Sequence, residues 1–521
     1  MQSKLNDRQM NPILYPIGIQ SFEQLRRYGY RYVDKTAYVY RLTREPKCFF
    51  LSRPRRFGKS LLLSTMEAYF LGKRELFEGL AISQWEKDWI EYPVLHFDFS
   101  RAEANDIAKL GSFILDTLKG YADQYGVKLR NETAGLGVMF GSLIEDIHAS
   151  TGKQVVILVD EYDKSTLEVI DNEKQLKENQ DLLQPFFTQI NALGAIIRFA
   201  FITGVARFRH YTLFSGFANL DDISLDDDYA AICGLTEQEL TENFAEGIKE
   251  FSEQMHCAEQ DAIQQLRFKY DGYRFTAADT LVYNPFSILN ALSKRRLQNF
   301  WVQSGASKPF IKFLTNTRFD IMSLLDAWLT AESLEATYSY EQPLPLLFQT
   351  GYLTIERVDG ALYKLNIPNG EVRSALVDEL IPKFMGINQD SLPKKLVSIK
   401  HMLESGDVDG FMRELQSMIA SIPYHEFDYG NVEKTYHLIV YQVFLMLGID
   451  ARSEIAVSGG RIDMVAQTAG YVYVFEFKLG NSPTEALSQI EDKGYSLPWS
   501  GDGRKVVKIG VQFSPDTRTI S

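Results

Sequence analysis

The sequence has few cysteines, no long uninterrupted apolar run and no excess of positive charge. Its 521 residues include three cysteines, Cys48, Cys233 and Cys257, without a C-x-x-C pair or a histidine spacing typical of zinc. We therefore expect free thiols in a reducing compartment, with neither a disulfide scaffold nor structural zinc. Because no segment has the apolar length of a membrane span or of a signal peptide, we expect a soluble, cytoplasmic protein without a membrane partner.

The formal net charge is -13, which excludes a general affinity for polyanions, so any contact with nucleic acid has to be local. Hydrophobic residues make up 45% of the chain and aromatic residues 13%, which is ample for globular packing. A chain of this length is too long for one hydrophobic core, and we expect two to four domains.

Four short apolar runs in the first half of the chain alternate with segments of helical length. These runs are residues 47–52, 92–100, 154–163 and 197–205. The alternation predicts a parallel sheet covered by helices. From residue 236 the pattern becomes mostly helical, beginning with a capping box formed by Thr236 and Glu239. Within this part, residues 346–369 resemble two hairpin strands around a turn at Asp359–Gly360.

The last part of the chain predicts a compact unit with the order helix, three strands, helix, strand. A long apolar helix is expected at 433–447, and the second helix has Ser482 as N-cap and Pro483 at its first position. We therefore expect three domains: a P-loop sheet domain at 1–235, a helical middle region with a small β insert at 236–424, and an αβββαβ domain at 425–521.

A candidate phosphate-binding loop follows the first apolar run. Gly58, Lys59 and Ser60 open a helix directly after this strand and its loop, which is the context in which backbone N–H groups, a lysine and a hydroxyl bind a nucleotide triphosphate and Mg²⁺. Arg53 stands where the usual motif has its first glycine. The alternative is an ordinary strand-to-helix turn in which Lys59 is solvated.

The third apolar run supplies the second half of such a site. It ends in Asp160, which would hold Mg²⁺ together with Ser60, and Glu161, which would polarise the attacking water. Thr203 ends the next run and fits a sensor of the γ-phosphate. Arg207 and Arg209 follow it and are candidates for a phosphate contact, although surface arginines are an equally good interpretation.

A second candidate site lies in the C-terminal part. In YVYVFEFKL the residues Glu476 and Lys478 share one strand face, and a turn near 468–470 would bring Asp463 within reach across the hairpin. Buried charges need a partner or an ion. Asp463, Glu476 and the carbonyl of Phe477 would suit Mg²⁺, with Lys478 orienting a water. The alternative is a surface ion pair, which contributes little.

These stretches resemble bacterial proteins that combine an N-terminal AAA-ATPase-like domain with a C-terminal domain of the PD-(D/E)XK nuclease superfamily. The resemblance runs along most of the chain, and its motifs are YPIGIQSFEQLRRYGYRYVDKT, RPRRFGKSLLLSTM, VDEYD, FITGVARF, LFSGFANLDDIS, YDGYRF, VYNPFSIL, LLFQTGYLTI, GRIDMV, FEFKLG and ALSQIEDKGY. It implies ATP-site roles for Lys59, Ser60, Asp160 and Glu161, a loop of the form RPRRFGKS, and a nuclease motif formed by Asp463, Glu476 and Lys478.

The resemblance also indicates accessory positions near the nuclease motif. Glu433, Glu454 and Gln489 are such candidates, and for the helical positions Glu433 and Gln489 a solvated side chain is the competing interpretation.

Two functions remain open at this point. The first is an ATP-binding protein, expected to be an ATPase, that controls a Mg²⁺-dependent nuclease acting on DNA, with RNA left open and a homo-oligomer as one arrangement. The second is a nucleotide-dependent switch or binding module that does not cleave. Residues 425–521 contain 12 Asp or Glu against 9 Lys or Arg, which favours the second function because DNA affinity usually needs a basic face.

Overall fold

The computed structural model describes residues 14–521 apart from 45–46, 104, 131–134, 171, 208–219, 305–326, 337–342, 380–391, 421–439, 441–442, 445–446, 448, 481 and 515–518. The described residues form two compact units, the first ending at Asn369 and the second beginning at Gly370. None of the helices in these ranges is long and apolar enough to cross a bilayer.

The first unit is built on a five-stranded sheet with the order β2-β3-β4-β1-β5, in which all neighbouring strands run parallel. Its strands are β1 (Cys48–Ser52), β2 (Val94–Asp98), β3 (Val155–Asp160), β4 (Ile197–Gly204) and β5 (Leu220–Asp222). The first four confirm the predicted parallel strands. The short edge strand β5 was not expected, because LDD carries no apolar run. Every residue of β3 is buried, as a central parallel strand requires.

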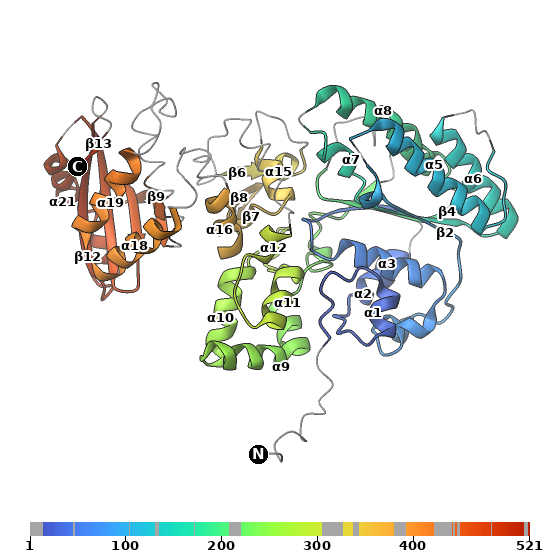
Figure 1. The fold of residues 1–521 in the computed structure, drawn as a ribbon, viewed down its shortest axis with the longest axis horizontal. Helices are drawn as coiled ribbons and strands as arrows, with labels where there is room; N and C mark the ends of the chain where they lie inside the picture. Colours follow the sequence, from blue (N-terminus) through green and yellow to red (C-terminus); the bar gives the residue numbers. More distant parts are fainter. Residues whose placement is uncertain are drawn as a thin grey trace, which may run out of the picture. The chain divides into compact units, whose positions relative to one another are not determined.

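Helices cover both faces of this sheet (Figure 1). One layer contains α1 (Phe22–Arg27), α2 (Thr36–Thr43) and α3 (Lys59–Phe70), and the other contains α5 (Ile107–Gln124), α6 (Leu136–Thr151) and α8 (Glu173–Ala192). Shorter helical turns are η1 (Arg74–Phe77), α4 (Ile82–Trp85), η2 (Phe99–Arg101) and α7 (Lys164–Leu167). The second layer is joined to the sheet by aromatic packing, since Phe186 stacks on Phe140 with ring centroids 4.1 Å apart and meets Phe97 edge-on.

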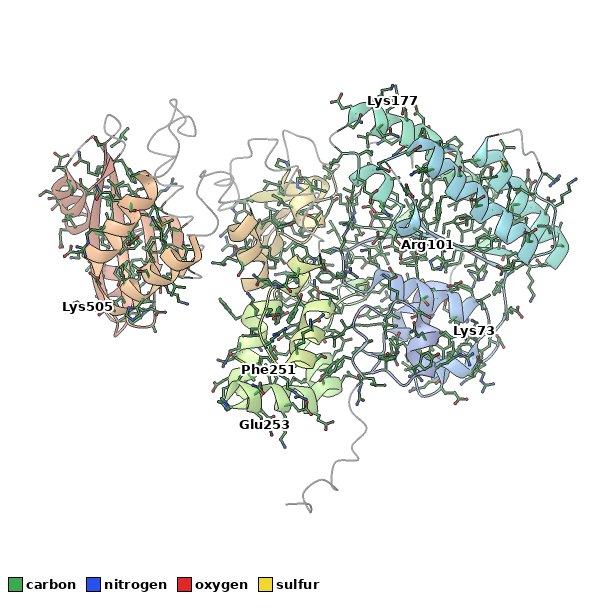
Figure 2. The ribbon with its side chains drawn as sticks, viewed as in Figure 1. Lys73, Arg101, Lys177, Phe251, Glu253 and Lys505 are labelled. Carbon is green, nitrogen blue, oxygen red and sulfur yellow. The ribbon has the colours of Figure 1, made fainter. Side chains whose placement is uncertain are left out.

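A bundle of helices follows the sheet in the chain and belongs to the same unit. It contains η4 (Asp227–Tyr229), α9 (Glu237–Met255), α10 (Glu259–Tyr270), α11 (Pro285–Lys294) and α12 (Phe300–Gln303). The predicted capping box of Thr236 and Glu239 is present at the start of α9. Phe251 of α9 is fully buried in the bundle core, whereas Glu253 lies on its outer surface (Figure 2).

The predicted β insert is partly helical. Its elements are β6 (Trp328–Thr330), α14 (Ala331–Leu334), α15 (Leu344–Gln349), β7 (Thr354–Asp359) and β8 (Leu362–Asn366), with an antiparallel sheet of order β6-β8-β7. The turn at Asp359–Gly360 is confirmed, but the expectation of strand from residue 346 is wrong. Pro345 near the N-terminus of α15 has a φ suited to the first turn of a helix, and Gly351, at φ 87°, follows its end.

The second unit has a five-stranded sheet of order β13-β12-β11-β10-β9. Its elements are α16 (Gly370–Glu379), α18 (Leu392–Ser405), α19 (Val408–Ala420), β9 (Asp450–Val457), β10 (Gly460–Gln467), β11 (Tyr471–Leu479), α21 (Pro483–Asp492), η7 (Leu497–Trp499), β12 (Lys505–Ser514) and β13 (Thr519–Ile520). The hairpin of β10 and β11 and the helix capped by Ser482 are confirmed. Most of the helix expected at 433–447 lies outside the described residues.

The two faces of this sheet are covered by different helices. Tyr473, Phe475 and Phe477 of β11 form a core with α18 and α19, while Val472 and Val474 pack on the opposite face with Ile490 of α21. The side-chain parity predicted for this strand is therefore present. Since α18 and α19 contribute to this core, the second unit begins earlier in the chain than the expected boundary at residue 425.

The aromatic core between α6, α8 and the first sheet makes a testable contribution to stability. Replacing fully buried Phe186 by alanine should lower the free energy of unfolding of the first unit by about 3–5 kcal/mol, because it removes a large buried ring and leaves a cavity. The same change at Phe268 of α10, which is 66% exposed, should alter it by less than about 0.5 kcal/mol. Calorimetric melting of the full chain separates the two results, and equal melting temperatures would contradict this packing.

Candidate functional site

The loop after β1 ends at the N-terminus of α3. Gly58 is the N-cap of this helix and has φ 98°, a conformation that favours glycine, and Lys59 and Ser60 form its first turn. The Lys59 ammonium is almost completely buried and donates to the carbonyl oxygens of Arg53 at 2.9 Å and Pro54 at 3.2 Å. A lysine and the first N–H groups of a helix are thereby gathered at one point, which is a suitable site for an anion.

Arg53 explains why this loop does not need the first glycine of the usual motif. Its side chain is buried, and its guanidinium donates to the carbonyl oxygens of Ser52, Ser224 and Tyr229. It also lies over the ring of Phe275 with its carbon 4.6 Å from the centroid, and burial lowers its pKa to about 10. The positive φ values in the loop fall at Arg56, with 72°, and at Gly58 instead.

Asp160 lies at the end of β3, against the first turn of α3. The Ser60 hydroxyl hydrogen-bonds its carboxylate and lowers its pKa, but burial is the larger effect and raises the pKa above its usual value. Asp98 at the end of β2 is the registered neighbour of Asp160, and its negative charge raises that pKa further. The hydroxyl and carboxylate oxygens gathered here are the ligand types that Mg²⁺ prefers. Sequence reasoning did not select Asp98, although it ends a recognised strand.

Glu161 and Thr203 occupy different positions relative to this edge of the sheet. Glu161 lines the adjacent pocket and has φ 50°, a conformation that is strained for a residue other than glycine and is often found at functional sites. Thr203 does not line the pocket. Its side chain is fully buried in β4, and in the described part of the chain its hydroxyl has no hydrogen-bond partner. A buried unpartnered hydroxyl suits a group that is satisfied by a ligand.

Arg207 has a structural set of partners. Its buried guanidinium lies 2.7 Å from a carboxylate oxygen of Asp222 and 2.9 Å from one of Glu335, and its backbone N–H donates to Gln349. It does not line the pocket, so the structure gives no support to the phosphate contact considered for it. Arg209 lies outside the described residues.

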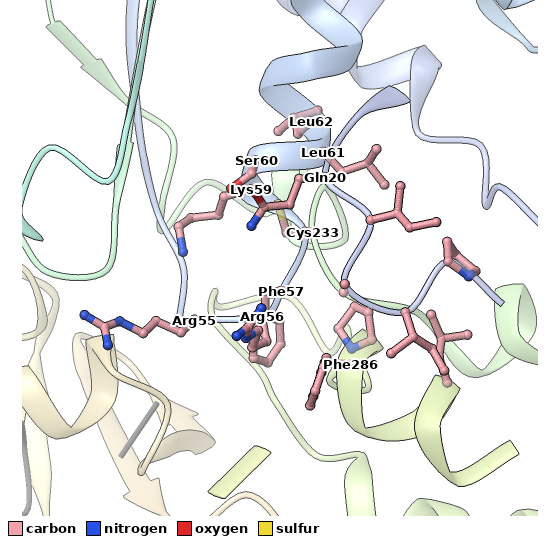
Figure 3. Close-up of a pocket in the computed structure, with 18 of the residues that line it drawn as sticks. Gln20, Arg55, Arg56, Phe57, Lys59, Ser60, Leu61, Leu62, Cys233 and Phe286 are labelled. Carbon is pink, nitrogen blue, oxygen red and sulfur yellow. The ribbon is translucent and has the colours of Figure 1, made fainter. Parts of the chain in front are cut away.

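A pocket of about 410 Å³ lies beside the phosphate-binding loop (Figure 3). Ser60, Lys59 and Gln20 are on one side of it, and Phe286 of α11 is on another. Much of its wall is apolar and comes from segments far apart in the sequence: Ile17, Ile19, Tyr32, Val33, Leu235, Phe244, Phe286 and Leu289. The volume is that of a small-molecule site.

Sequence reasoning missed this wall. The segment before α2 has neither helical nor strand periodicity, so its apolar residues suggest no face, and only the unusual density of aromatic and glycine residues in YPIGIQ and YGYRYV could have drawn notice. In the structure this segment packs on the helix bundle, where Tyr15 stacks on Phe244 with centroids 5.8 Å apart. Lys35 at its end pairs with Glu239 of α9 and lines the same pocket.

The second unit brings three of its four described candidates into direct contact. Lys478 Nζ lies 3.0 Å from Oε1 of Glu476, and the Gln489 side chain on α21 donates to the same oxygen. Asp463 accepts the N–H of Phe477 at 2.7 Å through its carboxylate, so it lies at the same end of the hairpin. The paired residues of β10 and β11 begin with Met464 and Phe475, and next to this pair the Asp463 carboxylate accepts a hydrogen bond from the backbone of β11.

Glu476 is the buried centre of this cluster. Its side chain is 2% exposed, and Oε2 has no hydrogen-bond partner among the described residues. Burial and the negative charge of Asp463 raise its pKa above the usual value, while Lys478 acts in the opposite direction. A buried, unsatisfied carboxylate oxygen beside a second carboxylate fits a divalent cation.

The described residues place two acidic side chains, those of Asp463 and Glu476, at this end of the hairpin. Within the described ranges, no group of three or more His, Cys, Asp or Glu side chains is gathered as a metal-binding set. Glu433 and the side chain of Glu454 lie outside the described residues. The candidate metal ligands among the described residues are therefore the two carboxylates of Asp463 and Glu476.

Comparison with known proteins agrees with this division. The family described as a predicted AAA-ATPase matches residues 16–214, and the PD-(D/E)XK nuclease superfamily matches residues 431–521. An Azotobacter chroococcum protein described as "Uncharacterized protein in vnfD 5'region" is 35% identical over 518 residues, covering 97% of both chains. The chain belongs to the family of AAA-ATPase-like proteins with a C-terminal PD-(D/E)XK domain.

A solved structure, that of the Aeropyrum pernix ORC2 protein in ADPNP and ADP complexes, has a TM-score of 0.24 and 12% identity. It covers 69% of this chain and 92% of that one, and a likeness of this degree carries no functional inference.

The two family matches include most of the candidate residues but not the whole pocket. The AAA-ATPase match contains the loop at 53–60, the end of β3 and Thr203, and the nuclease match contains Asp463, Glu476 and Gln489. Phe286 and the other pocket residues of the helix bundle lie outside both. The family assignment alone would therefore not have identified them.

The buried charge of Glu476 should lower the stability of the second unit relative to a variant that has a neutral side chain at this position. We expect Glu476→Gln to raise its melting temperature in EDTA by a few degrees, because the change removes a buried charge that lies near Asp463. As a matched control, Glu491→Gln on α21 removes a largely exposed charge that pairs with Lys508 and should change little. Calorimetry of the full-length variants decides, and a lower melting temperature for Glu476→Gln would contradict the unsatisfied buried carboxylate.

Proposed function

We propose that the first unit binds ATP in the pocket beside α3 and hydrolyses it. The observation that carries this proposal is the convergence of Lys59, Ser60 and Asp160 at the carboxyl edge of the parallel sheet, next to the pocket. Ligands of open parallel sheets bind at this edge.

The pocket has the two kinds of surface that a nucleotide needs. Its apolar wall, from Ile17 and Val33 to Phe286, suits a flat base, and the start of α3 suits phosphate groups. Arg56 lies between these regions, with its guanidinium carbon 5.1 Å from the ring centroid of Phe286. A nucleotide would thus contact the N-terminal segment, the loop and the helix bundle at once.

Each residue has a distinct role in this proposal. Lys59 would exchange its bonds to the loop carbonyls for bonds to the β- and γ-phosphates, while Ser60 and Asp160 would hold Mg²⁺. The metal neutralises phosphate charge when it is bound. Glu161 lines the pocket and would take the proton of the attacking water, and Thr203 would respond to the γ-phosphate.

ATP turnover by the full chain tests these roles. Glu161→Gln should lower kcat by about 10²-fold or more while the Kd for ATP stays within threefold, because general-base catalysis contributes on that order and the substitution is isosteric. Lys59→Ala should weaken binding itself. Glu145→Gln, which changes an exposed side chain of α6, is the matched control and should resemble the wild type. An unchanged kcat for Glu161→Gln would contradict the role of Glu161 as base.

We also propose that the second unit is a Mg²⁺-dependent deoxyribonuclease. Support comes from the buried, unsatisfied Glu476 oxygen beside Asp463 and from the family to which the unit belongs. Asp463 and Glu476 would hold the metal, which supplies an activated water and stabilises charge on the phosphate when bound. Lys478 would orient that water, and Gln489 would keep the Glu476 carboxylate in place through its hydrogen bond.

Cleavage of supercoiled and linear DNA, with and without ATP, tests this second proposal. The wild type should cleave with Mg²⁺ and not with EDTA, and Lys478→Ala should lower the rate by about 10²-fold or more. Lys505→Ala at the exposed start of β12 is the matched control. Mg²⁺ should raise the melting temperature of the wild type but not of Glu476→Gln. A wild type that cuts no nucleic acid under any of these conditions would contradict nuclease activity.

One observation favours a non-cleaving alternative. Residues 425–521 carry more acidic than basic residues, which does not favour a broad basic face, and the described candidate metal ligands are two carboxylates. In this alternative, nucleotide binding in the first unit switches a binding module. Salt-dependent DNA binding without hydrolysis in the experiment above would support it.

A further inference from the structure

The end of β4 is bonded to both halves of the proposed ATP site. Strand β4 ends at Gly204, the residue after Thr203, and the chain then continues through Val205 and Ala206. The carbonyl of Gly204 accepts the N–H of Arg53 at the start of the phosphate-binding loop at 3.2 Å. The carbonyl of Thr203 accepts the N–H of Tyr162, two residues after Asp160, at 3.2 Å.

Asp163 makes the strongest of these links. One oxygen of its carboxylate, Oδ2, accepts the N–H of Val205 at 2.8 Å and that of Ala206 at 2.6 Å. The side chain is 1% exposed, and hydrogen bonds from two backbone donors to an ionised carboxylate are stronger than neutral ones. The neighbouring Tyr162 hydroxyl donates to the carbonyl of Ala206 at 2.8 Å. The turn that carries Glu161 and the strand that carries Thr203 are therefore bonded as one piece.

Gly204 shows how close this contact is. A Cβ atom at this position would lie 2.6 Å from Oδ1 of Asp163 and 2.7 Å from the ring of Tyr162, which is closer than such atoms approach in proteins. Both neighbours are fully enclosed, so neither can move away easily. Only glycine fits at this contact, where the backbone meets the two side chains.

Two other roles for the Asp163 side chain, lining the pocket and capping α7, are not supported by its contacts. It does not line the pocket, and although Asp163 is the N-cap residue of α7, its side chain makes no capping hydrogen bond to that helix. Burial raises the pKa of its carboxyl to about 6, so the fold keeps a carboxylate where an apolar residue would be less costly, and the two backbone donors are its clearest compensation.

We infer that Asp163 is a positioning residue for ATP hydrolysis, which sets the distance between Glu161 and Thr203 by holding the backbone of Val205 and Ala206. This inference rests on the proposed ATPase function and adds a residue to it. Binding of the base and of the α- and β-phosphates depends on the pocket wall and on α3, and among the described residues the Asp163 carboxylate hydrogen-bonds neither of them. Its loss should therefore affect kcat and leave nucleotide affinity in place.

Three full-length variants test the inference by kcat and by the Kd for ADP. Asp163→Ala removes the acceptor and should lower kcat at least tenfold with Kd within threefold of wild type. Asp163→Asn can present its amide oxygen where Oδ2 lies, so it should keep kcat within threefold. Gly204→Ala adds the clashing Cβ and should reproduce the kcat loss of Asp163→Ala by displacing the same contact from the other side.

The outcomes separate this inference from the proposed function. A wild type without ATP turnover would overturn the proposed hydrolysis and the inference with it. A wild type that turns over ATP, with Asp163→Ala at the same kcat, would overturn the inference alone. So would a Kd that rises in parallel with the loss of kcat, because that result indicates general damage. If Asp163→Ala does not fold, a tenfold kcat loss in folded Asp163→Asn would still contradict the acceptor role.

Discussion

Both units place a carboxyl group at or near the end of a buried, apolar strand. Asp160 ends β3, in which every residue is buried, and Glu476 lies near the end of β11 among buried neighbours. Burial raises the pKa of each carboxyl group, which means that the surrounding fold disfavours the ionised form. Such a charge is tolerated only where hydrogen-bond donors or cations are brought to it. The surrounding elements are arranged to supply them, from the Ser60 hydroxyl in one unit and from Lys478 and Gln489 in the other.

The strand positions of these carboxylates could be predicted from the sequence, because apolar runs that end in acids indicate buried strands. The parity of residues 471–479 likewise predicted which side chains share a face, and the two separate cores on either side of β11 confirm it. These signals are local and periodic. They depend on the nearest neighbours in the chain, which sequence patterns report well.

The remaining features depend on contacts between distant segments and have no local signal. Arg53 departs from the usual motif at its first glycine, and only the buried hydrogen bonds from its side chain to the carbonyls of Ser224 and Tyr229 show that it anchors the loop. The pocket wall joins residues near 17 and 33 to residues near 244 and 286, and the sequence of neither stretch indicates by itself that it lines a pocket. Helices α18 and α19 were assigned to a middle region for the same reason, since only their packing shows that they cover the second sheet.

The ion pair of Lys478 and Glu476 bears on the choice between a structural and a catalytic reading of the second unit. A surface ion pair would have left both carboxylate oxygens solvated or paired, whereas here Lys478 and Gln489 both bond Oε1 and leave the buried Oε2 without a partner in the described residues. Because two donors hold Oε1, the orientation of the Glu476 carboxylate is fixed, and so is the position of Oε2. A carboxylate oriented in this way beside Asp463 is a better arrangement for a cation than for stability, because an unsatisfied buried oxygen weakens the fold that holds it.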